Sequence, residues 1–426
     1  MKNYLTALFL LLIYSAPASA AAPTITSLLE GLKKQPDIEA SALNVKAADM
    51  QLKQAHAELY PTVSAFGSYT SFNSPTNLRP MTPTEVNIAA GDSIPFSEEI
   101  LRYGLKAEMP LFVKSLYSLA DKVKQLQKAS RAGHKLRLIS REASVVSLDA
   151  ALAFSEHLDK AIVSRLESLH KTRDDLQLAV DIGRIPESEL LKVETILNNL
   201  QKQRNDLQRQ TISLTSQLEQ LTGTRLEHFV PLSLKRPVID GEFLRQRQLQ
   251  ANVAAAEKGL QQARDRHYPA IKLEGILSEN EGDAYNTGNS IDRSYNYIGI
   301  KLAIPLFNRT LSTSIDQANI QLQREKRKLS QLRIDLMAKA QTLREQLPII
   351  DQSTMLAQTS LDNNQRLLSI AKVAYRSGRM TTEEYLRFET QVLDAEAALY
   401  KTYVDRWQIV SQQAVLYGDD LTGVVQ

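Results

Sequence analysis

The segment Met109-Pro110-Leu111-Phe112 returns 195 residues later as Ile304-Pro305-Leu306-Phe307. The same displacement relates Gly183-Arg184 to Gly378-Arg379, Glu189 to Glu384, and Gly223 to Gly418. Further upstream, Tyr60-Pro61 matches Tyr268-Pro269 at a displacement of 208, so the first copy carries 13 additional residues between these motifs. A repeat of this kind indicates two copies of one structural unit. We expect a first repeat over 21–223, a linker over 224–240 and a second repeat over 241–426.

The first 20 residues have the three parts of a cleavable secretory signal. Lys2 precedes an apolar run over 5–13, and the small residues Ala18-Ser19-Ala20 follow. The chain has no cysteine. In an exported protein this excludes disulfides, thiolate metal sites and a lipidated N-terminal cysteine, so we expect a protein that carries no attached lipid.

Charge and hydropathy narrow the class further. With 51 basic and 48 acidic residues the chain is nearly neutral, which argues against a nucleic-acid partner. After the signal, no uninterrupted apolar stretch approaches the roughly 20 residues that a membrane-spanning helix needs. If the chain crosses a bilayer, we expect it to cross as β-strands.

Two very long helices dominate the expected secondary structure. Residues 115–182 contain no proline and one glycine, and their apolar residues recur at three- and four-residue spacing. At 1.5 Å per residue such a helix extends about 100 Å. The second copy repeats it over 311–377, where Pro348 predicts a kink or the loss of one backbone hydrogen bond. Shorter helices are expected over about 38–58, 187–222, 243–266 and 381–417.

A pair of strands precedes each long helix, over about 61–73 and 100–112 in the first copy and 269–280 and 293–306 in the second. Leu101, Tyr103 and Leu105 alternate with Arg102 and Lys106, which is the period of a strand with one apolar face. Strands of about ten alternating residues bordered by tyrosines are typical of outer-membrane barrels, although a small soluble sheet packed on helices fits the same pattern. Four strands are too few to close a membrane barrel, so the membrane interpretation requires oligomerisation.

At this point the chain resembles the TolC-type outer-membrane efflux and secretion ducts over nearly its whole mature length. The resemblance rests on the duplicated order of helix, strand pair, helix and helix, on the two Tyr-Pro and two Pro-Leu-Phe motifs, and on the turn containing Tyr375, Gly378, Glu384 and Leu386.

The resemblance implies a mostly α, α+β membrane protein that forms a homotrimer. Three protomers would contribute four strands each to one 12-strand outer-membrane β-barrel, continued by a periplasmic α-helical barrel. It implies a location in the outer membrane of a Gram-negative bacterium, in contact with lipid. The implied partners are a periplasmic adaptor, or membrane fusion protein, and an inner-membrane transporter that supplies the energy for efflux or type I secretion.

The resemblance also implies a periplasmic gate. Glu384 matches an acid of the family's aperture ring, and Glu189 is its counterpart in the first copy. Three copies of such an acid around an axis would favour cations, whereas an acid in the first turn of a helix can instead simply complement the helix dipole. Arg387 stands where the family has a second aperture acid and would weaken the ring or pair with Glu384. Tyr375 is a candidate latch across the turn or a packing residue.

The two Gly-Arg turns, Gly183-Arg184 and Gly378-Arg379, are candidate adaptor contacts, and ordinary helix capping is the alternative. No catalytic, cofactor-binding or metal site is expected: the six histidines never fall at i and i+3 or i+4, and no phosphate-binding glycine loop or nucleophile elbow occurs. A passive duct is the favoured function. A periplasmic coiled-coil adaptor or structural protein without conduction is the alternative.

Overall fold

The computed structural model describes residues 23–81 and 85–426, so the expected signal over 1–20 lies outside the described residues. The elements are α1 (Ile25–Lys33), α2 (Pro36–Ala57), β1 (Thr62–Asn77), η1 (Ile88–Ala90), β2 (Phe96–Phe112), α3 (Lys114–Asp181), α4 (Glu187–Thr222), α5 (Leu244–Asp265), β3 (Ala270–Asp283), β4 (Ser290–Ala303), α6 (Arg309–Arg376), α7 (Thr382–Tyr417) and η2 (Leu421–Gly423). The expected fold class is confirmed: the chain is mostly helical and carries two strand pairs, each followed by a long helix.

The chain divides into two compact units that cut across the sequence repeats. Unit 1 contains the described part of 1–38 together with 138–240 and 340–426, and unit 2 contains 39–137 and 241–339. Each unit therefore takes a part of each copy, and the division falls within α2, α3 and α6.

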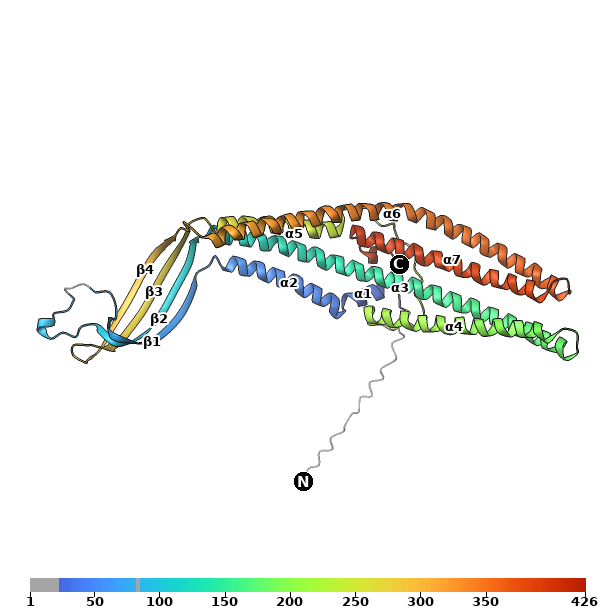
Figure 1. Ribbon diagram of the computed structural model, residues 1–426, viewed down its shortest axis with the longest axis horizontal. Coiled ribbons are helices and arrows are strands. Elements are labelled where there is room, and N and C mark those ends of the chain that lie inside the picture. The colour runs from blue at the N-terminus through green and yellow to red at the C-terminus, as the bar shows by residue number, and fades with distance from the viewer. Residues whose placement is uncertain (1–22, 82–84) are drawn as a thin grey trace, which may run out of the picture. The chain divides into compact units, whose positions relative to one another are not determined.

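Unit 2 contains one antiparallel sheet in the order β1-β2-β3-β4, with the strands side by side (Figure 1). The register places Val63 opposite Ala107, Ala107 opposite Gly275, and Gly275 opposite Ile298. Directly opposed residues share a face, and alternate residues along a strand return to it. The pairing therefore collects most of the apolar side chains of the four strands on one face, as the alternation predicted.

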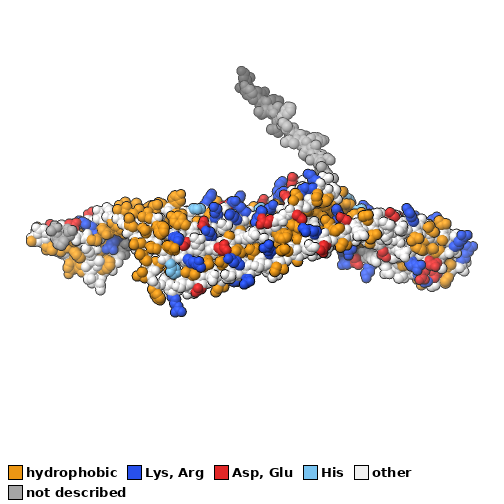
Figure 2. Space-filling view, turned by 90° about the horizontal axis from the view of Figure 1, so that it is seen from above, with side chains coloured by type: hydrophobic (Ala, Val, Ile, Leu, Met, Phe, Trp, Pro, Cys, Tyr) orange, Lys and Arg blue, Asp and Glu red, His pale blue; other side chains and the backbone are white. Residues whose placement is uncertain are grey.

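The apolar face of the sheet is unusually exposed. Figure 2 shows hydrophobic side chains gathered over the strands. On β4, Ile298 is 77% and Ile300 is 70% exposed, and Leu105 and Leu277 of the central strands are also exposed. The other face carries ion pairs, with Lys106 Nζ 2.5 Å from Glu108 Oε1 and Lys301 Nζ 3.5 Å from Glu274 Oε1. A sheet with this distribution places its apolar face outward rather than against its own helices.

Helix packing in unit 2 is local and modest. Val253 and Leu260 of α5 pack with Leu322 of α6 in a small buried cluster. At the junction of strands and helices, the Lys114 ammonium lies 3.4 Å from the centroid of the Tyr268 ring and 3.4 Å from Asp265 Oδ1. These contacts hold the start of α3 against the end of α5.

In unit 1, α4 and α7 pack against the C-terminal part of α3 through one leucine-rich core. Leu169 and Val193 are fully buried in it, together with Leu386 and Leu393 of α7. The α6 helix continues to Arg376 with Pro348 inside it, so the backbone remains helical where proline removes one N–H donor. Within residues 23–81 and 85–426, no helix combines the length and apolar character that crossing a membrane requires.

Gly104 tests the sheet register. A Cβ at this position would stand 2.1 Å from the Leu277 carbonyl oxygen, whereas a Cβ at Gly67 of β1 would have nothing within 4 Å. We expect Gly104→Ala to force β2 from β3 at a cost of about 1–3 kcal/mol and to lower the thermal midpoint measured by circular dichroism in detergent. Gly67→Ala is the matched control, and equal midpoints for the two variants would contradict the register.

Candidate functional site

The two Gly-Arg turns have the same hydrogen-bonded geometry. Gly183 has φ 74° and Gly378 has φ 69°, the left-handed conformation that glycine adopts without steric cost. The N–H of Gly183 donates to the Val180 carbonyl at 2.8 Å, and the N–H of Arg184 donates to the Ala179 carbonyl at 2.9 Å. The N–H groups of Gly378 and Arg379 repeat this pattern with the Tyr375 and Ala374 carbonyls. Both turns are thus Schellman caps that end the long helices.

The same turns present free surface. Gly183, Arg184, Gly378 and Arg379 are all exposed, and a Cβ added to either glycine would meet nothing within 4 Å. The capping role that the sequence offered as an alternative is therefore present, and it leaves the arginine side chains available to a partner. Their contact with an adaptor remains a prediction.

Glu384 is the third residue of α7 and completes a capping box with Thr381. Its Oε2 accepts the Thr381 N–H at 3.0 Å and the Thr381 hydroxyl at 3.0 Å, while the Glu384 N–H donates to Thr381 Oγ1 at 3.3 Å. These hydrogen bonds, the backbone one first, lower the pKa of Glu384, and the positive charge of Arg387 adds to the effect. Glu384 is therefore an exposed anion at neutral pH that also stabilises the helix start.

Three of the four predicted gate residues line one groove between α4 and α7. Glu189, Glu384 and Arg387 surround a cavity of about 860 Å³ together with Lys192 and Glu383. Glu189 is paired within its own helix, since Lys192 Nζ lies 2.8 Å from Glu189 Oε1. The groove thus brings acids of the two repeats together, and two basic side chains balance part of their charge.

Tyr375, the fourth predicted residue, lies outside this groove. Its ring stacks on the ring of Tyr385, with centroids 4.8 Å apart and planes at 9°. The contact joins the end of α6 to the first turns of α7. This packing geometry is the second of the two roles that the sequence suggested for Tyr375.

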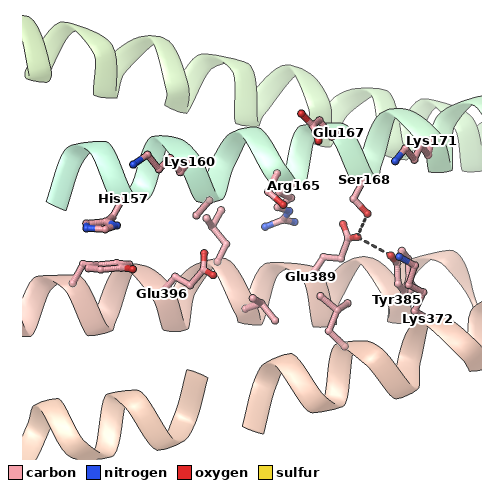
Figure 3. A pocket seen from close by; sticks show the side chains of 16 residues that line it. His157, Lys160, Arg165, Glu167, Ser168, Lys171, Lys372, Tyr385, Glu389 and Glu396 are labelled. Atoms are coloured by element: carbon pink, nitrogen blue, oxygen red, sulfur yellow. Dashed lines mark hydrogen bonds between the residues drawn. The ribbon is translucent and has the colours of Figure 1, made fainter. Parts of the chain in front are cut away.

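A buried polar network adjoins the stacked tyrosines and was not predicted. Glu389 Oε1 accepts the Ser168 hydroxyl at 2.6 Å and the Tyr385 hydroxyl at 2.7 Å, and an Arg165 Nη donates to Thr390 Oγ1 at 2.7 Å. Burial raises the pKa of Tyr385 to about 12, so its hydroxyl keeps the proton that it donates. The Ser168–Glu389 and Arg165–Thr390 hydrogen bonds join α3 to α7 beside a cavity of about 630 Å³. Figure 3 shows the hydrogen bonds of Glu389 with Ser168 and Tyr385.

The network is costly to bury and therefore sensitive to separation of the helices. Among the described residues, Glu389 Oε2 and Arg165 Nε are buried side-chain atoms without a hydrogen-bond partner. The sequence did carry a signal for Glu389, because it occupies a core position of the apolar stripe that contains Leu386 and Leu393. An acid at such a position requires specific partners, but the sequence does not reveal that Ser168 and Tyr385 supply them.

Comparison with known proteins agrees with this geometry. Residues 246–412 match the outer membrane efflux protein family, so the family resemblance inferred from the sequence is confirmed. None of the curated proteins matches the chain.

Solved outer-membrane channels share the fold. The Campylobacter jejuni CmeC channel superposes with a TM-score of 0.79 at 17% identity, over 94% of this chain and 85% of CmeC. VceC of Vibrio cholerae superposes with a TM-score of 0.77 at 15% identity, over 94% of this chain and 96% of VceC. The open state of the Neisseria gonorrhoeae MtrE channel superposes with a TM-score of 0.73 at 16% identity, over 94% of this chain and 90% of MtrE. At these identities the likeness establishes the fold.

The Schellman turns yield a local prediction. Gly378→Ala keeps ample space but places a Cβ on a left-handed residue, which costs about 1 kcal/mol. We expect hydrogen exchange at the Arg379 amide to accelerate about fivefold. Gly241→Ala is the control, because Gly241 has equally open space and no positive φ. Unchanged exchange in Gly378→Ala would show that the cap does not hold this turn.

Proposed function

We propose that the protein is the outer-membrane channel component of a tripartite efflux pump or type I secretion system, a passive gated duct from an inner-membrane transporter across the periplasm and outer membrane. The observation that carries this proposal is the sheet of unit 2. Its apolar face is exposed and its other face bears paired lysines and glutamates. Such a sheet suits lipid on one side and a water-filled lumen on the other.

The open edges of the sheet support a homotrimer. In a single protomer β1 and β4 are the outer strands of the sheet, and each pairs with one neighbouring strand only. Unpaired backbone groups are expensive in lipid, and four strands are too few to close a barrel. If β4 of each protomer pairs with β1 of the next protomer, three protomers form a closed barrel of 12 strands.

Exposed apolar residues on α6 support the same assembly. Within unit 2 they include Ile320 and Ile334, and within unit 1 they include Ile349, Leu356 and Ile370. Several of these residues are 7 or 14 positions apart, so they follow one face of the helix. A second copy of this chain would bury the stripe and complete a helical barrel.

The Gly-Arg turns are the proposed docking points for a periplasmic adaptor. Arg184 and Arg379 stand exposed beside caps of identical geometry. Acidic or hydrogen-bond-accepting groups of an adaptor could therefore use the two repeats equivalently. The adaptor in turn would connect the duct to the inner-membrane transporter, which supplies the energy.

The proposed gate is the groove lined by Glu189, Glu384 and Arg387. In a trimer three Glu384 carboxylates would approach the axis and favour cations, while the three Arg387 side chains would moderate the effect. Opening would draw α7 away from α3. That movement would break the Ser168–Glu389 and Arg165–Thr390 hydrogen bonds, so the buried network would oppose it.

A periplasmic coiled-coil adaptor that does not conduct is the alternative. It accounts for the long helices but leaves the exposed apolar face of the sheet without a role. Recovery of the protein in the outer-membrane fraction as a trimer that dissociates only on heating supports the duct. A soluble periplasmic protein supports the adaptor.

Ion selectivity in single-channel recordings tests the proposed gate. Glu384→Gln removes the charge but retains the capping geometry, because glutamine serves equally in a capping box. We expect it to reduce cation selectivity in planar bilayers, whereas Glu383→Gln, one residue earlier and outside the capping hydrogen bonds, should have a smaller effect. Because helix capping is preserved, any change reports the lost charge rather than a frayed helix.

Two outcomes would contradict parts of this proposal. Equal selectivity for wild type and Glu384→Gln would keep the duct and place its gate elsewhere. Absence of conductance from a verified membrane-inserted trimer, even after Glu389→Ala weakens the buried network, would contradict the duct itself.

A further inference from the structure

Three acids on α3 lie seven residues apart, and each accepts a hydrogen bond from a backbone N–H group. Leu421 N–H donates to Glu142 Oε2 at 3.2 Å, Val230 N–H donates to Asp149 Oδ1 at 2.9 Å, and Phe229 N–H donates to Glu156 Oε1 at 2.7 Å. A spacing of seven places all three carboxyl groups along one side of the helix. All of the groups belong to unit 1.

The backbone segments that these acids hold are paired with each other. Residues 229–236 of the inter-repeat linker and 419–426 of the C-terminus form what we call the terminal ribbon. The N–H of Ser233 donates to the Gln426 carbonyl at 2.9 Å, and the N–H of Gln426 donates to the Ser233 carbonyl at 3.0 Å. Leu234 and Val425 form a β-bridge between the segments, and Arg236 makes two 2.7 Å hydrogen bonds to Asp419. The ribbon thus joins the middle of the chain to its end.

Two of the three acids are completely buried. Glu142 and Asp149 have 0% exposure, and in each carboxyl group one oxygen accepts a backbone N–H. Among the described residues, the second oxygens, Glu142 Oε1 and Asp149 Oδ2, are buried without a hydrogen-bond partner. Burial disfavours a charge that is satisfied on one side only, so the neutral carboxylic acid is the better-suited form.

The charged groups near Glu142 and Asp149 favour the neutral carboxylic acids more than they favour the carboxylates. Glu142 faces Asp420 of the ribbon, whose negative charge opposes ionisation, and Lys33 at the end of α1, which favours it less. Asp149 faces Glu156 on its own helix, and Glu156 in turn lies 3.3 Å from His228 Nδ1. Burial is the largest cause in both cases, and the pKa of Glu142 and that of Asp149 are each raised to about 7.

We propose that Glu142 and Asp149 make the terminal ribbon a proton-dependent clasp, which is held firmly against α3 when both carboxyl groups are protonated and loosens as they ionise. The proposal rests on the contacts within unit 1 and is independent of the proposed trimer and gate. In the proposed duct, the stability of this segment would depend on the pH of its surroundings.

The direction of the effect follows from proton binding. In the clasped state the two carboxyl groups retain protons up to about pH 7, whereas in a released ribbon they would lose them near their ordinary values. The clasped state binds more protons, so its stability is complete at low pH and is lost as the pH rises through the range up to about 7. Above that range no further change is expected from these groups.

Hydrogen exchange of the full-length protein in detergent tests the clasp. After correction for intrinsic exchange, protection of the Leu421 and Val230 amides should fall between pH 5 and pH 7 by up to about tenfold per pH unit for each carboxyl group, and then level off. Glu142→Gln and Asp149→Asn retain a side-chain oxygen for the same N–H but cannot ionise. We expect the double variant to keep at pH 8 the protection that the wild type has at pH 5.

Glu156→Gln is the matched control, because Glu156 makes the same kind of contact but its side chain is 14% exposed. It should retain the wild-type pH dependence at Leu421 and shift that at Val230 only slightly to lower pH, because the Glu156 charge is the smallest of the causes named for the pKa of Asp149. Wild-type protection that is flat or rises between pH 5 and pH 7 would overturn the proposal, as would a double variant that keeps the wild-type slope. The wild-type series alone decides the sign, so a variant that fails to fold does not remove the test.

Discussion

The unpaired backbone groups on the outer edges of β1 and β4 impose the strongest constraint on this chain. The sheet ends at these two strands, and its apolar face is exposed at residues such as Ile298 and Ile300. In water an exposed apolar sheet invites aggregation, and in lipid an open edge leaves hydrogen bonds unmade. Pairing of the two edges with further protomers would meet both demands. The proposed trimer, the helical barrel that continues it and the function as a duct all depend on this closure.

Duplication explains how one chain provides both the sheet and the helical wall. Each copy supplies two strands followed by a long helix that ends in a Schellman cap of the same geometry. The compact units nevertheless cut across the copies, because α3 and α6 are far longer than any one core. Each long helix belongs to one sequence repeat but has parts in both units. Buried contacts between the two repeats, such as the Ser168–Glu389 hydrogen bond, lie where α3 packs against α7.

Much of the fold could be predicted because it is local. Period-two alternation predicted the apolar face of the strands, and glycines predicted the ends of the long helices at Gly183 and Gly378. Other features depend on contacts between residues far apart in sequence. The terminal ribbon and the burial of Glu142 and Asp149 have no local signature. The short α1 helix does have one, because Leu28 and Leu32 recur at helical spacing after the Thr24 cap, although this helix was not predicted. Only the seven-residue spacing of the acids was visible, and spacing does not distinguish a solvated face from a buried one.

The candidate site divides along the same line. The sequence located the turns and the groove residues Glu189, Glu384 and Arg387, which the structure brings together. Thr381 and Glu384 have the spacing of a capping box, so this contact was readable from the sequence although it was not predicted. The stacking of Tyr375 on Tyr385 was not readable. The two tyrosines lie within one short stretch, but the geometry of their rings depends on the rotamers that the surrounding helices permit.

The most direct test of the account is disulfide formation between the edges of the sheet. The chain has no cysteine, so Val63→Cys on β1 can be combined with a cysteine at Asn296, Ile298 or Ile300 on the same face of β4. Within one copy these strands are separated by about 14 Å, beyond the roughly 7 Å limit for a disulfide. The account predicts oxidation to covalent trimers for at least one pair and not for Lys301→Cys on the opposite face. Monomers for every pair would contradict closure of the sheet by three copies.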